Sequence, residues 1–346
     1  MKETQVIKGP TAIVLTFVVL AACQLARAVI EPVVFAFFVI MITWPLNKAL
    51  QSRMPKALAL LLTIIITAGF IFVLFWMIAW GGHQVADWIR LNLDRARDVL
   101  VSSTAWLEEH DIFVLALITE HVNPSSMLAF FHAVAVRMNT VLAFSVIVLI
   151  FVLMGLAETE AFQKKIASGK NQDIARRVMT AGKKISEKFQ KYMLVRTLAS
   201  IATGLAVGLF MLLMGLELAS AWGVLSFALN YMPYIGPLVV TVLPALTAFI
   251  QTGSTETALF VLLGLVLIQF VIGSYLEPVF SGTALAISPT VVMFAILLWT
   301  FLWGALGAFL GVPLAIATLT VCEQFPSTRW IADILSGDSP KEAAEA

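Results

Sequence analysis

The sequence predicts an all-α protein that crosses a membrane several times and contains broken helices or re-entrant hairpins. Three observations predict this fold class. Of the 346 residues, 60% are hydrophobic and only 12% are charged, whereas a soluble domain has about a quarter charged residues. The apolar residues form runs close to the roughly 20 residues that a membrane-spanning helix needs. Two of these runs, 220–250 and 288–322, exceed one span and are interrupted by proline and glycine.

The N-terminal runs are predicted to be spans that remain in the protein. The first run follows Lys2 and Lys8, which is the charge pattern of a signal peptide. However, Val29 to Pro45 is hydrophobic again, and no small-residue cleavage site precedes a polar mature domain. We therefore expect a retained span. In order, the apolar runs lie at 11–25, 28–46, 58–80, 140–157, 197–216, 220–250, 257–276 and 288–322.

The charge of the polar segments predicts the side of the membrane on which each lies. Residues 47–57 carry basic residues and no acid, and residues 158–196 carry ten Lys or Arg against four acids. Residues 82–139 instead carry four Arg against seven acids. Because Lys and Arg concentrate in cytoplasmic loops, the first two segments are predicted in the cytoplasm and the third outside. The spans between them agree, since 58–80 leads out and 140–157 leads back.

These assignments predict how the chain is organised, with both termini in the cytoplasm. The basic segment has apolar residues every three or four positions, which indicates an amphipathic helix. This helix either lies on the anionic inner leaflet or packs against the protein itself. Its apolar residues are Ile174, Val178, Ala181, Ile185, Phe189 and Tyr192. The predicted parts are N-terminal spans (1–81), a helical extracytoplasmic insert (82–139), a span (140–157), the basic cytoplasmic amphipathic segment (158–196), a motif-rich domain (197–325) and a cytoplasmic tail (326–346).

The motif-rich domain is predicted to contain an inverted repeat. From Thr197 to Thr328 there is no Lys or Arg, so orientation must follow from counting spans. That count makes 220–250 a hairpin that opens outward and 288–322 a hairpin that opens inward, each preceded by one span. Inverted repeats whose discontinuous helices meet near the membrane midplane are typical of secondary transporters.

The stretch from Asn230 to Pro237, NYMPYIGP, places helix breakers inside apolar sequence. Pro233 and Pro237 remove amide donors, and Gly236 permits a turn that a side chain would block. Irregular backbone at membrane depth is tolerated only where it is buried in protein or lines a water-filled cavity. The stretch is therefore either a simple hairpin tip or part of a solute path. We favour the path, because the second long run, 288–322, is also interrupted by proline and glycine.

Polar residues near the breakers are candidate groups of this path. Glu277 either reaches water at the end of its span or is a proton or cation site, the usual role of an acid inside a membrane domain. Gln269 is either a polar link between helices or part of the path. The glycine pairs Gly204/Gly208 and Gly307/Gly311 have a spacing that indicates close helix packing. The candidate pathway residues are Asn230, Pro233, Gly236, Pro237, Gln269, Glu277, Pro278, Ser288, Pro289, Gly311 and Pro313.

The sequence lacks the signatures of enzymes, metal sites and cofactor sites. It has no HExxH motif, no Gly-x-Ser-x-Gly elbow and no complete phosphate-binding loop. We therefore predict no enzymatic activity, no cofactor and no ATP-driven step. Cys23 and Cys322 lack neighbouring histidines and are not expected to bind metal or to form a disulfide framework. The net charge of +1 does not indicate nucleic-acid binding; the expected partners are membrane lipid and a small-molecule or cation substrate.

Three stretches, NYMPYIGP, YLEPVFSGTALAISP and WGALGAFLGVPLA, carry a resemblance to a known family. Their order is similar to that in the autoinducer-2 exporter (AI-2E) family of bacterial inner-membrane transporters, and the layout resembles that family from about residue 11 to 325. The resemblance implies a transport domain at 197–325, an inner-membrane location and a homo-oligomer. Many members have basic residues where this chain has Val279 and Thr283, so a role of that charge is not carried over.

The resemblance implies either export of autoinducer-2, a quorum-sensing furanone, or sodium(lithium)/proton antiport. A polar uncharged solute suits a path with Asn, Ser, Thr and backbone groups and no Lys or Arg. Antiport needs a titratable carboxylate, for which Glu277 is the candidate. We favour efflux of a small polar molecule. A non-transporting membrane scaffold acting through the amphipathic segments is a further alternative, but it leaves the broken hairpins unexplained.

Overall fold

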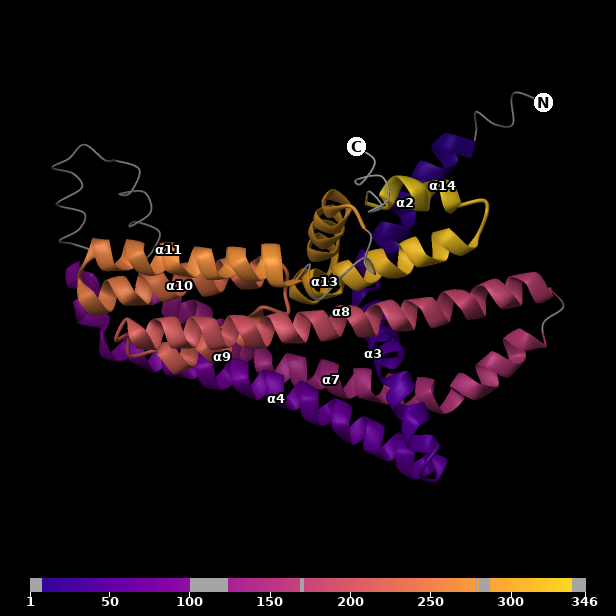
Figure 1. The fold of residues 1–346 in the computed structure, drawn as a ribbon, viewed down its shortest axis with the longest axis horizontal. Coiled ribbons are helices and arrows are strands. Elements are labelled where there is room, and N and C mark those ends of the chain that lie inside the picture. The colour runs from indigo at the N-terminus through magenta and orange to yellow at the C-terminus, as the bar shows by residue number, and fades with distance from the viewer. Residues whose placement is uncertain (1–7, 100–123, 169–170, 278, 280–286, 338–346) are drawn as a thin grey trace. The chain divides into compact units, whose positions relative to one another are not determined.

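The computed structural model describes residues 8–99, 124–168, 171–277, 279 and 287–337. All regular secondary structure in these ranges is helical, as the sequence predicted (Figure 1). Seven of the helices described are long and apolar enough to cross a membrane. The elements are α2 (Lys8–Leu25), α3 (Arg27–Gln51), α4 (Lys56–Leu91), α7 (Pro124–Ala167), α8 (Gln172–Leu213), α9 (Ala219–Leu229), α10 (Ile235–Thr252), α11 (Thr255–Val271), the π-helix η1 (Ile272–Leu276), α13 (Pro289–Gln324) and α14 (Arg329–Leu335).

Three helices extend well beyond the spans predicted from hydropathy. α4 continues past residue 80, α7 begins before residue 140, and α8 begins before residue 197. The 44 residues of α7 extend about 66 Å at the usual rise per residue, about twice the thickness of a bilayer's hydrocarbon core. A hydropathy window ends where charged residues begin, whereas the hydrogen-bonded backbone of a helix continues through them.

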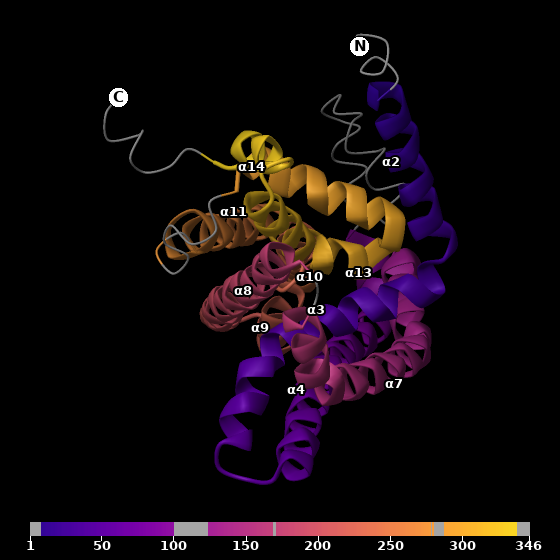
Figure 2. The ribbon, with the colours of Figure 1, turned by 90° about the vertical axis from the view of Figure 1, so that its right-hand side faces the viewer.

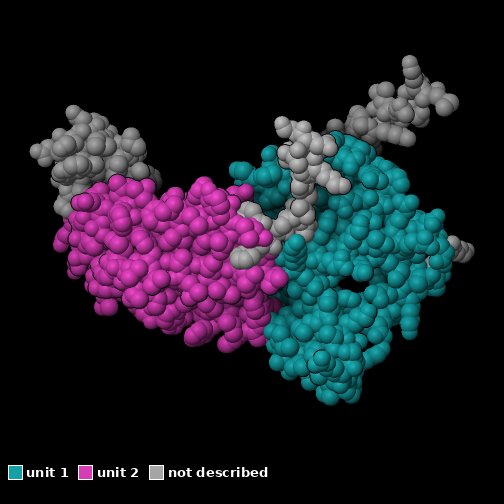
Figure 3. All heavy atoms as spheres, in the orientation of Figure 1, with its two compact units in different colours: residues 1–67, 144–192, 283–346 teal, residues 68–143, 193–282 magenta. Residues whose placement is uncertain are grey.

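The chain forms two compact units, each assembled from separate stretches of sequence (Figure 3). Unit 1 comprises residues 1–67, 144–192 and 283–346, and unit 2 comprises residues 68–143 and 193–282. α4, α7 and α8 therefore contribute residues to both units, and the helices of each unit can be followed from a second direction in Figure 2. This division reflects packing, whereas the division predicted from charge reflects the sides of the membrane.

In unit 2, the first predicted hairpin consists of α9 and α10, which fold back on each other. Trp222 Nε1 of α9 donates a hydrogen bond of 3.0 Å to Thr247 Oγ1 of α10. α9 also lies close to α8, because a Cβ on Gly223 would come within 3.0 Å of the Gly204 carbonyl oxygen and 3.1 Å of Gly208 Cα. The packing role predicted for the Gly204/Gly208 pair is confirmed.

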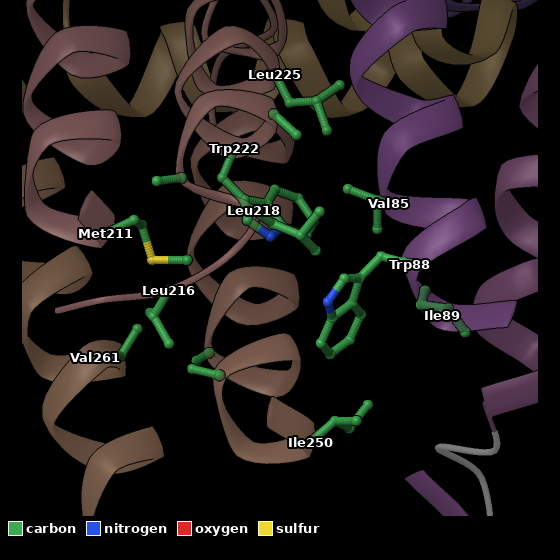
Figure 4. Close-up of a cluster of buried hydrophobic side chains, with 14 of the residues drawn as sticks. Val85, Trp88, Ile89, Met211, Leu216, Leu218, Trp222, Leu225, Ile250 and Val261 are labelled. Carbon is green, nitrogen blue, oxygen red and sulfur yellow. The ribbon is translucent and has the colours of Figure 1, made fainter. Parts of the chain in front are cut away.

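The hydrophobic core of unit 2 is built from α4, α8, α9, α10 and α11 (Figure 4). Trp222 and Met211 are fully buried in it. The opposite face of α8 carries exposed leucines, including Leu205, Leu209 and Leu212. Exposed apolar patches of this kind mark contact with a membrane or a partner, and on a span-length helix we interpret this stripe as lipid-facing.

In unit 1, the second predicted hairpin is a single helical run, α13, that is broken at Gly304 (φ 63°, ψ −137°). Such a backbone conformation favours glycine. The two arms lie against each other beside the break: a Cβ on Gly307 would overlap the Trp299 carbonyl oxygen, and one on Gly311 would lie 2.8 Å from Ile296 Cα. The Gly307/Gly311 pair is therefore also a packing feature, although it packs the arms of one broken helix.

Aromatic residues join the helices of unit 1. Phe35 and Phe38 of α3 each lie with their ring centroid 5.7 Å from that of Phe309 in α13, and Phe38 lies 5.1 Å from Phe189 in α8. Trp303, next to the break in α13, donates a hydrogen bond of 3.2 Å to the carbonyl oxygen of Cys23 in α2. The second hairpin is thus held against the two N-terminal helices.

The amphipathic helix predicted in the basic segment forms the first half of α8. Its apolar residues from position 181 onward, Ala181, Ile185, Phe189 and Tyr192, are buried, whereas Ile174 and Val178 are exposed. Between the two interpretations of this helix, packing against the protein therefore holds for residues 181–192. Basic side chains of the same helix hold the end of α13: Arg177 donates to the Gln324 carbonyl oxygen at 2.7 Å, and Lys188 pairs with Glu323 at 3.3 Å.

Candidate functional site

The tip of the α9–α10 hairpin is held to α8 by polar side chains. Asn230, the C-cap residue of α9, is only 3% exposed. Its Nδ2 donates to Ser200 Oγ at 3.3 Å, and the Tyr231 hydroxyl donates to Thr197 Oγ1 at 2.9 Å. The sequence predicted Asn230 as a pathway residue; in the structure, one of its side-chain donors is bonded to α8.

The chain reverses direction at Tyr234. This residue has φ 61° and ψ −47°, and the N–H of Ile235 donates to the Pro233 carbonyl oxygen at 2.7 Å. This is a γ-turn of the rare, strained kind with positive φ. Within the described ranges, Tyr234 is the one non-glycine residue with positive φ, a conformation that costs about 1–3 kcal/mol and is found most often at functional sites.

Gly236 leaves room for the turn, as the sequence predicted, through close backbone packing and without a positive φ. Its φ is not positive, because the positive φ of this turn falls two residues earlier, at Tyr234. Gly236 is buried, and a Cβ there would overlap the carbonyl oxygen of Leu229 and lie 2.6 Å from its carbonyl carbon. Pro237 is the third residue of α10, where a backbone N–H has no helical acceptor and a proline is therefore tolerated.

Glu277 is paired with Arg196, a residue outside the set of candidates. Arg196 Nη1 lies 2.5 Å from Glu277 Oε1, with the arginine side chain 9% exposed and the glutamate side chain 28% exposed. The Arg196 Nε is buried and has no hydrogen-bond partner. Removing one partner of a buried ion pair costs about 3–5 kcal/mol, because the other charge is left uncompensated.

The position of Glu277 is set by η1. The Glu277 N–H donates to the Ile272 carbonyl oxygen, which is the spacing of a π-helix. A π-turn contains more residues than an α-turn, so it rotates the side chains that follow it relative to those of α11. Short π segments inside helices are frequent at functional sites.

One turn of α8 brings these contacts together. Arg196, Thr197 and Ser200 bond to Glu277, Tyr231 and Asn230 respectively. This polar cluster is defined as Arg196, Thr197, Ser200, Asn230, Tyr231 and Glu277, and all of it belongs to unit 2. It offers a carboxylate, a guanidinium, hydroxyls and an amide, with its two formal charges paired. Such groups can exchange hydrogen bonds with a polar solute. The guanidinium of Arg196 corrects the expectation of a path without Lys or Arg.

The remaining candidate residues lie elsewhere. Gln269 is in α11, and its Nε2 is buried without a partner. Pro278 lies outside the described residues. The other four belong to unit 1. Ser288 is the N-cap of α13, and its N–H donates to the Leu335 carbonyl oxygen at 3.2 Å. Pro289 begins that helix, and Gly311 and Pro313 are buried in its second arm.

Sequence reasoning missed Arg196 because it lies at the edge of the basic segment assigned to the cytoplasm. Its partner Glu277 is 81 positions away, which no local pattern indicates. One signal was available: the buried positions of α8 continue from Phe189 and Tyr192 to Arg196 and Ser200 at helical spacing. Extending the apolar periodicity by one turn would have placed Arg196 on the buried face.

The structure gives no indication of a metal centre in the part of the chain that it describes. No group of three or more His, Cys, Asp or Glu is placed there to hold an ion. Cys23 and Cys322 are both free thiols. The contacts of the polar cluster itself are hydrogen bonds and a charge pair.

Comparison with known proteins identifies relatives over almost the entire chain. The model of the "AI-2E family transporter" family matches residues 12–327. The "AI-2 transport protein TqsA" of Escherichia coli (strain K12) is 29% identical over 330 residues, covering 92% of each chain. A Haemophilus influenzae protein named "Putative transport protein" is 27% identical over 327 residues, covering 92% of this chain and 93% of its own.

Proposed function

Because the chain belongs to the AI-2E transporter family, we propose that it is a secondary transporter that exports a small polar molecule such as autoinducer-2. Its relative in Escherichia coli is named for transport of AI-2. The observation that carries the proposal is the tip of the α9–α10 hairpin, where Asn230 and Tyr231 are bonded to α8 beside the Arg196–Glu277 pair. The solute would pass along this polar cluster.

The hairpin tip is suited to a path because it interrupts an apolar stretch, between the short helix α9 and the span-length helix α10, with polar and strained groups. Irregular backbone at membrane depth occurs where it is buried in protein or lines a cavity. The strained γ-turn at Tyr234 and the close contact at Gly236 hold the tip in one conformation. A tip that only reversed the chain would need neither the buried amide of Asn230 nor a paired acid nearby.

The two broken helices form the inverted repeat of this transport domain in our proposal. Each follows a long apolar helix, α8 or α11. Each has a glycine just beyond its break, Gly236 or Gly307, whose missing side chain makes room for a carbonyl oxygen of the preceding arm. This shared glycine contact supports a common origin of the two hairpins. Their opposite orientation in the membrane follows from the count of spans.

The membrane sides follow from charge. We place residues 82–139 outside and residues 158–196 in the cytoplasm of a bacterial inner-membrane protein, with both termini inside, because Lys and Arg concentrate in cytoplasmic segments. The basic residues of α8 are then cytoplasmic, next to the C-terminal end of α13 that they hold. We also expect a homo-oligomer, as the family resemblance implies.

Sodium(lithium)/proton antiport is the alternative, and the partial exposure of Glu277 is the observation in its favour. The pairing with Arg196 weighs against it, since a guanidinium at hydrogen-bond distance already balances the carboxylate that a cation would need. A non-transporting scaffold would need neither the polar cluster nor its ion pair. Export of a neutral solute accounts for both.

One experiment separates these functions. The purified protein is reconstituted into liposomes, and fluxes of labelled autoinducer-2 and of radioactive sodium are measured with and without a proton gradient. Export predicts autoinducer-2 flux above that of empty liposomes, without sodium flux. Sodium flux driven by the proton gradient would establish antiport instead, and the absence of both fluxes would favour a scaffold.

A further inference from the structure

We propose that Arg196 and Glu277 form a charge-balanced selectivity site that admits neutral hydroxylated molecules and offers no binding site to small ions of either sign. This inference rests on the proposed function and names the class of substrate. Arg196 was not among the predicted pathway residues, and the assignment depends on its contact with Glu277.

The two side chains of the pair differ in their solvent exposure. The Glu277 side chain is 28% exposed, whereas that of Arg196 is 9% exposed. The carboxylate is therefore the accessible surface of the site, and the guanidinium lies behind it. A molecule that reaches the pair meets a negative group backed at 2.5 Å by a positive one.

Arg196 also has hydrogen-bonding capacity to spare. Its Nη1 is bonded to Glu277, but its Nε is buried and has no partner. A buried unpaired donor is rare and calls for an explanation. A solute oxygen that accepts from this N–H, while a neighbouring hydroxyl donates to the carboxylate, would satisfy both groups.

No other cation is available to take the place of Arg196 in the following sequence. From Thr197 to Thr328 there is no Lys or Arg, and among the described residues Arg196 is the cation that pairs with Glu277. For a cation approaching the carboxylate, the guanidinium behind it cancels most of the attraction that an unpaired carboxylate would offer. An anion is repelled by the carboxylate in front. A neutral molecule with adjacent hydroxyls meets neither penalty and matches the donor and the acceptor.

Variants of the pair test this inference through the dependence of thermal stability and ion flux on the ion present. A purely structural role of the pair would not change this dependence. R196Q leaves the carboxylate unbalanced, E277Q leaves the guanidinium unbalanced, and the double variant R196Q/E277Q removes both charges. Each full-length protein is purified in detergent, and its thermal stability is compared in sodium chloride, choline chloride and sodium gluconate. Sodium flux is then measured in liposomes.

We expect sodium to stabilise R196Q more than choline does. We also expect the sodium flux of R196Q to be roughly tenfold above that of the wild type, a change that corresponds to about 1.4 kcal/mol. E277Q should instead gain stabilisation by chloride over gluconate. Wild type and the double variant should show neither effect. If R196Q does not fold, E277Q and the double variant still test the charge balance with the opposite sign.

Lys188 provides the matched control, because it pairs with Glu323 at 3.3 Å on the same helix but outside the polar cluster. K188Q removes the same charge and should gain no sodium effect. Sodium stabilisation of the wild type, an equal gain in K188Q, or the absence of any ion effect in folded R196Q and E277Q would overturn the inference. Absence of autoinducer-2 flux in the wild type would contradict the proposed substrate. The comparison of sodium and chloride effects among the variants would still test the charge balance of Arg196 and Glu277.

Discussion

Replacing Gly236 with alanine tests how closely the arms of the first hairpin meet. The new Cβ would overlap the Leu229 carbonyl oxygen, lie 2.6 Å from its carbonyl carbon and lie 3.2 Å from the Asn230 nitrogen. Carbon contacts below 3.0 Å force a shift, and here the atoms are backbone, which cannot rotate away as a flexible side chain can. Overpacking of this kind costs about 1–3 kcal/mol.

The expected result is a lower Tm for G236A in detergent, followed by intrinsic tryptophan fluorescence. A stability change of 1 kcal/mol shifts Tm by about 2–4 °C in a domain of 150–250 residues, so we expect a fall of about 2–12 °C. Autoinducer-2 flux should fall as well, because the tip carries Asn230 and Tyr231. The change is small enough for the protein to insert into the membrane.

Gly69 provides the matched control for this substitution. It lies within α4, and a Cβ there would meet nothing within 4 Å. Because alanine has a helix propensity about 1 kcal/mol better than glycine, G69A should melt at or above the wild-type temperature. If G236A melts together with G69A, the arms are not in contact at Gly236 and our account of the tip is wrong.

Three further predictions concern topology, packing and the path. Cysteines introduced at Ser103 and Ser168 should differ in labelling by a membrane-impermeant thiol reagent applied outside, with only the first reacting; equal labelling would refute the assigned sides. Trp222→Phe removes the buried hydrogen bond to Thr247 and part of a fully buried ring, so it should cost about 1–3 kcal/mol in thermal stability. An unchanged Tm would mean that the packing of α9 on α10 does not need this contact. Asn230→Leu leaves buried polar groups unpaired, which costs about 1–3 kcal/mol, and should abolish autoinducer-2 flux while membrane insertion persists; normal flux would make the tip a structural turn.

Several features followed from local sequence alone. Long apolar runs determined the all-α class, since a lipid environment leaves a spanning chain few ways to satisfy its backbone other than a helix. Proline and glycine inside two of those runs predicted both broken helices, and the Gly204/Gly208 spacing predicted close helix packing, which in the structure is between α8 and α9. These predictions succeeded because each depends on residues close together in the chain.

Other features required the tertiary structure. The strained residue of the first tip is Tyr234, which no local pattern indicates, and Gly236 is needed for the room that it leaves to Leu229. Helix ends could not be read from hydropathy, since the helical hydrogen bonds of α4, α7 and α8 continue through charged residues. The sequence by itself determined that Glu277 is an acid in an apolar domain. Only the fold decided that it is balanced, because that depends on α8 bringing Arg196 to it across 81 positions of sequence.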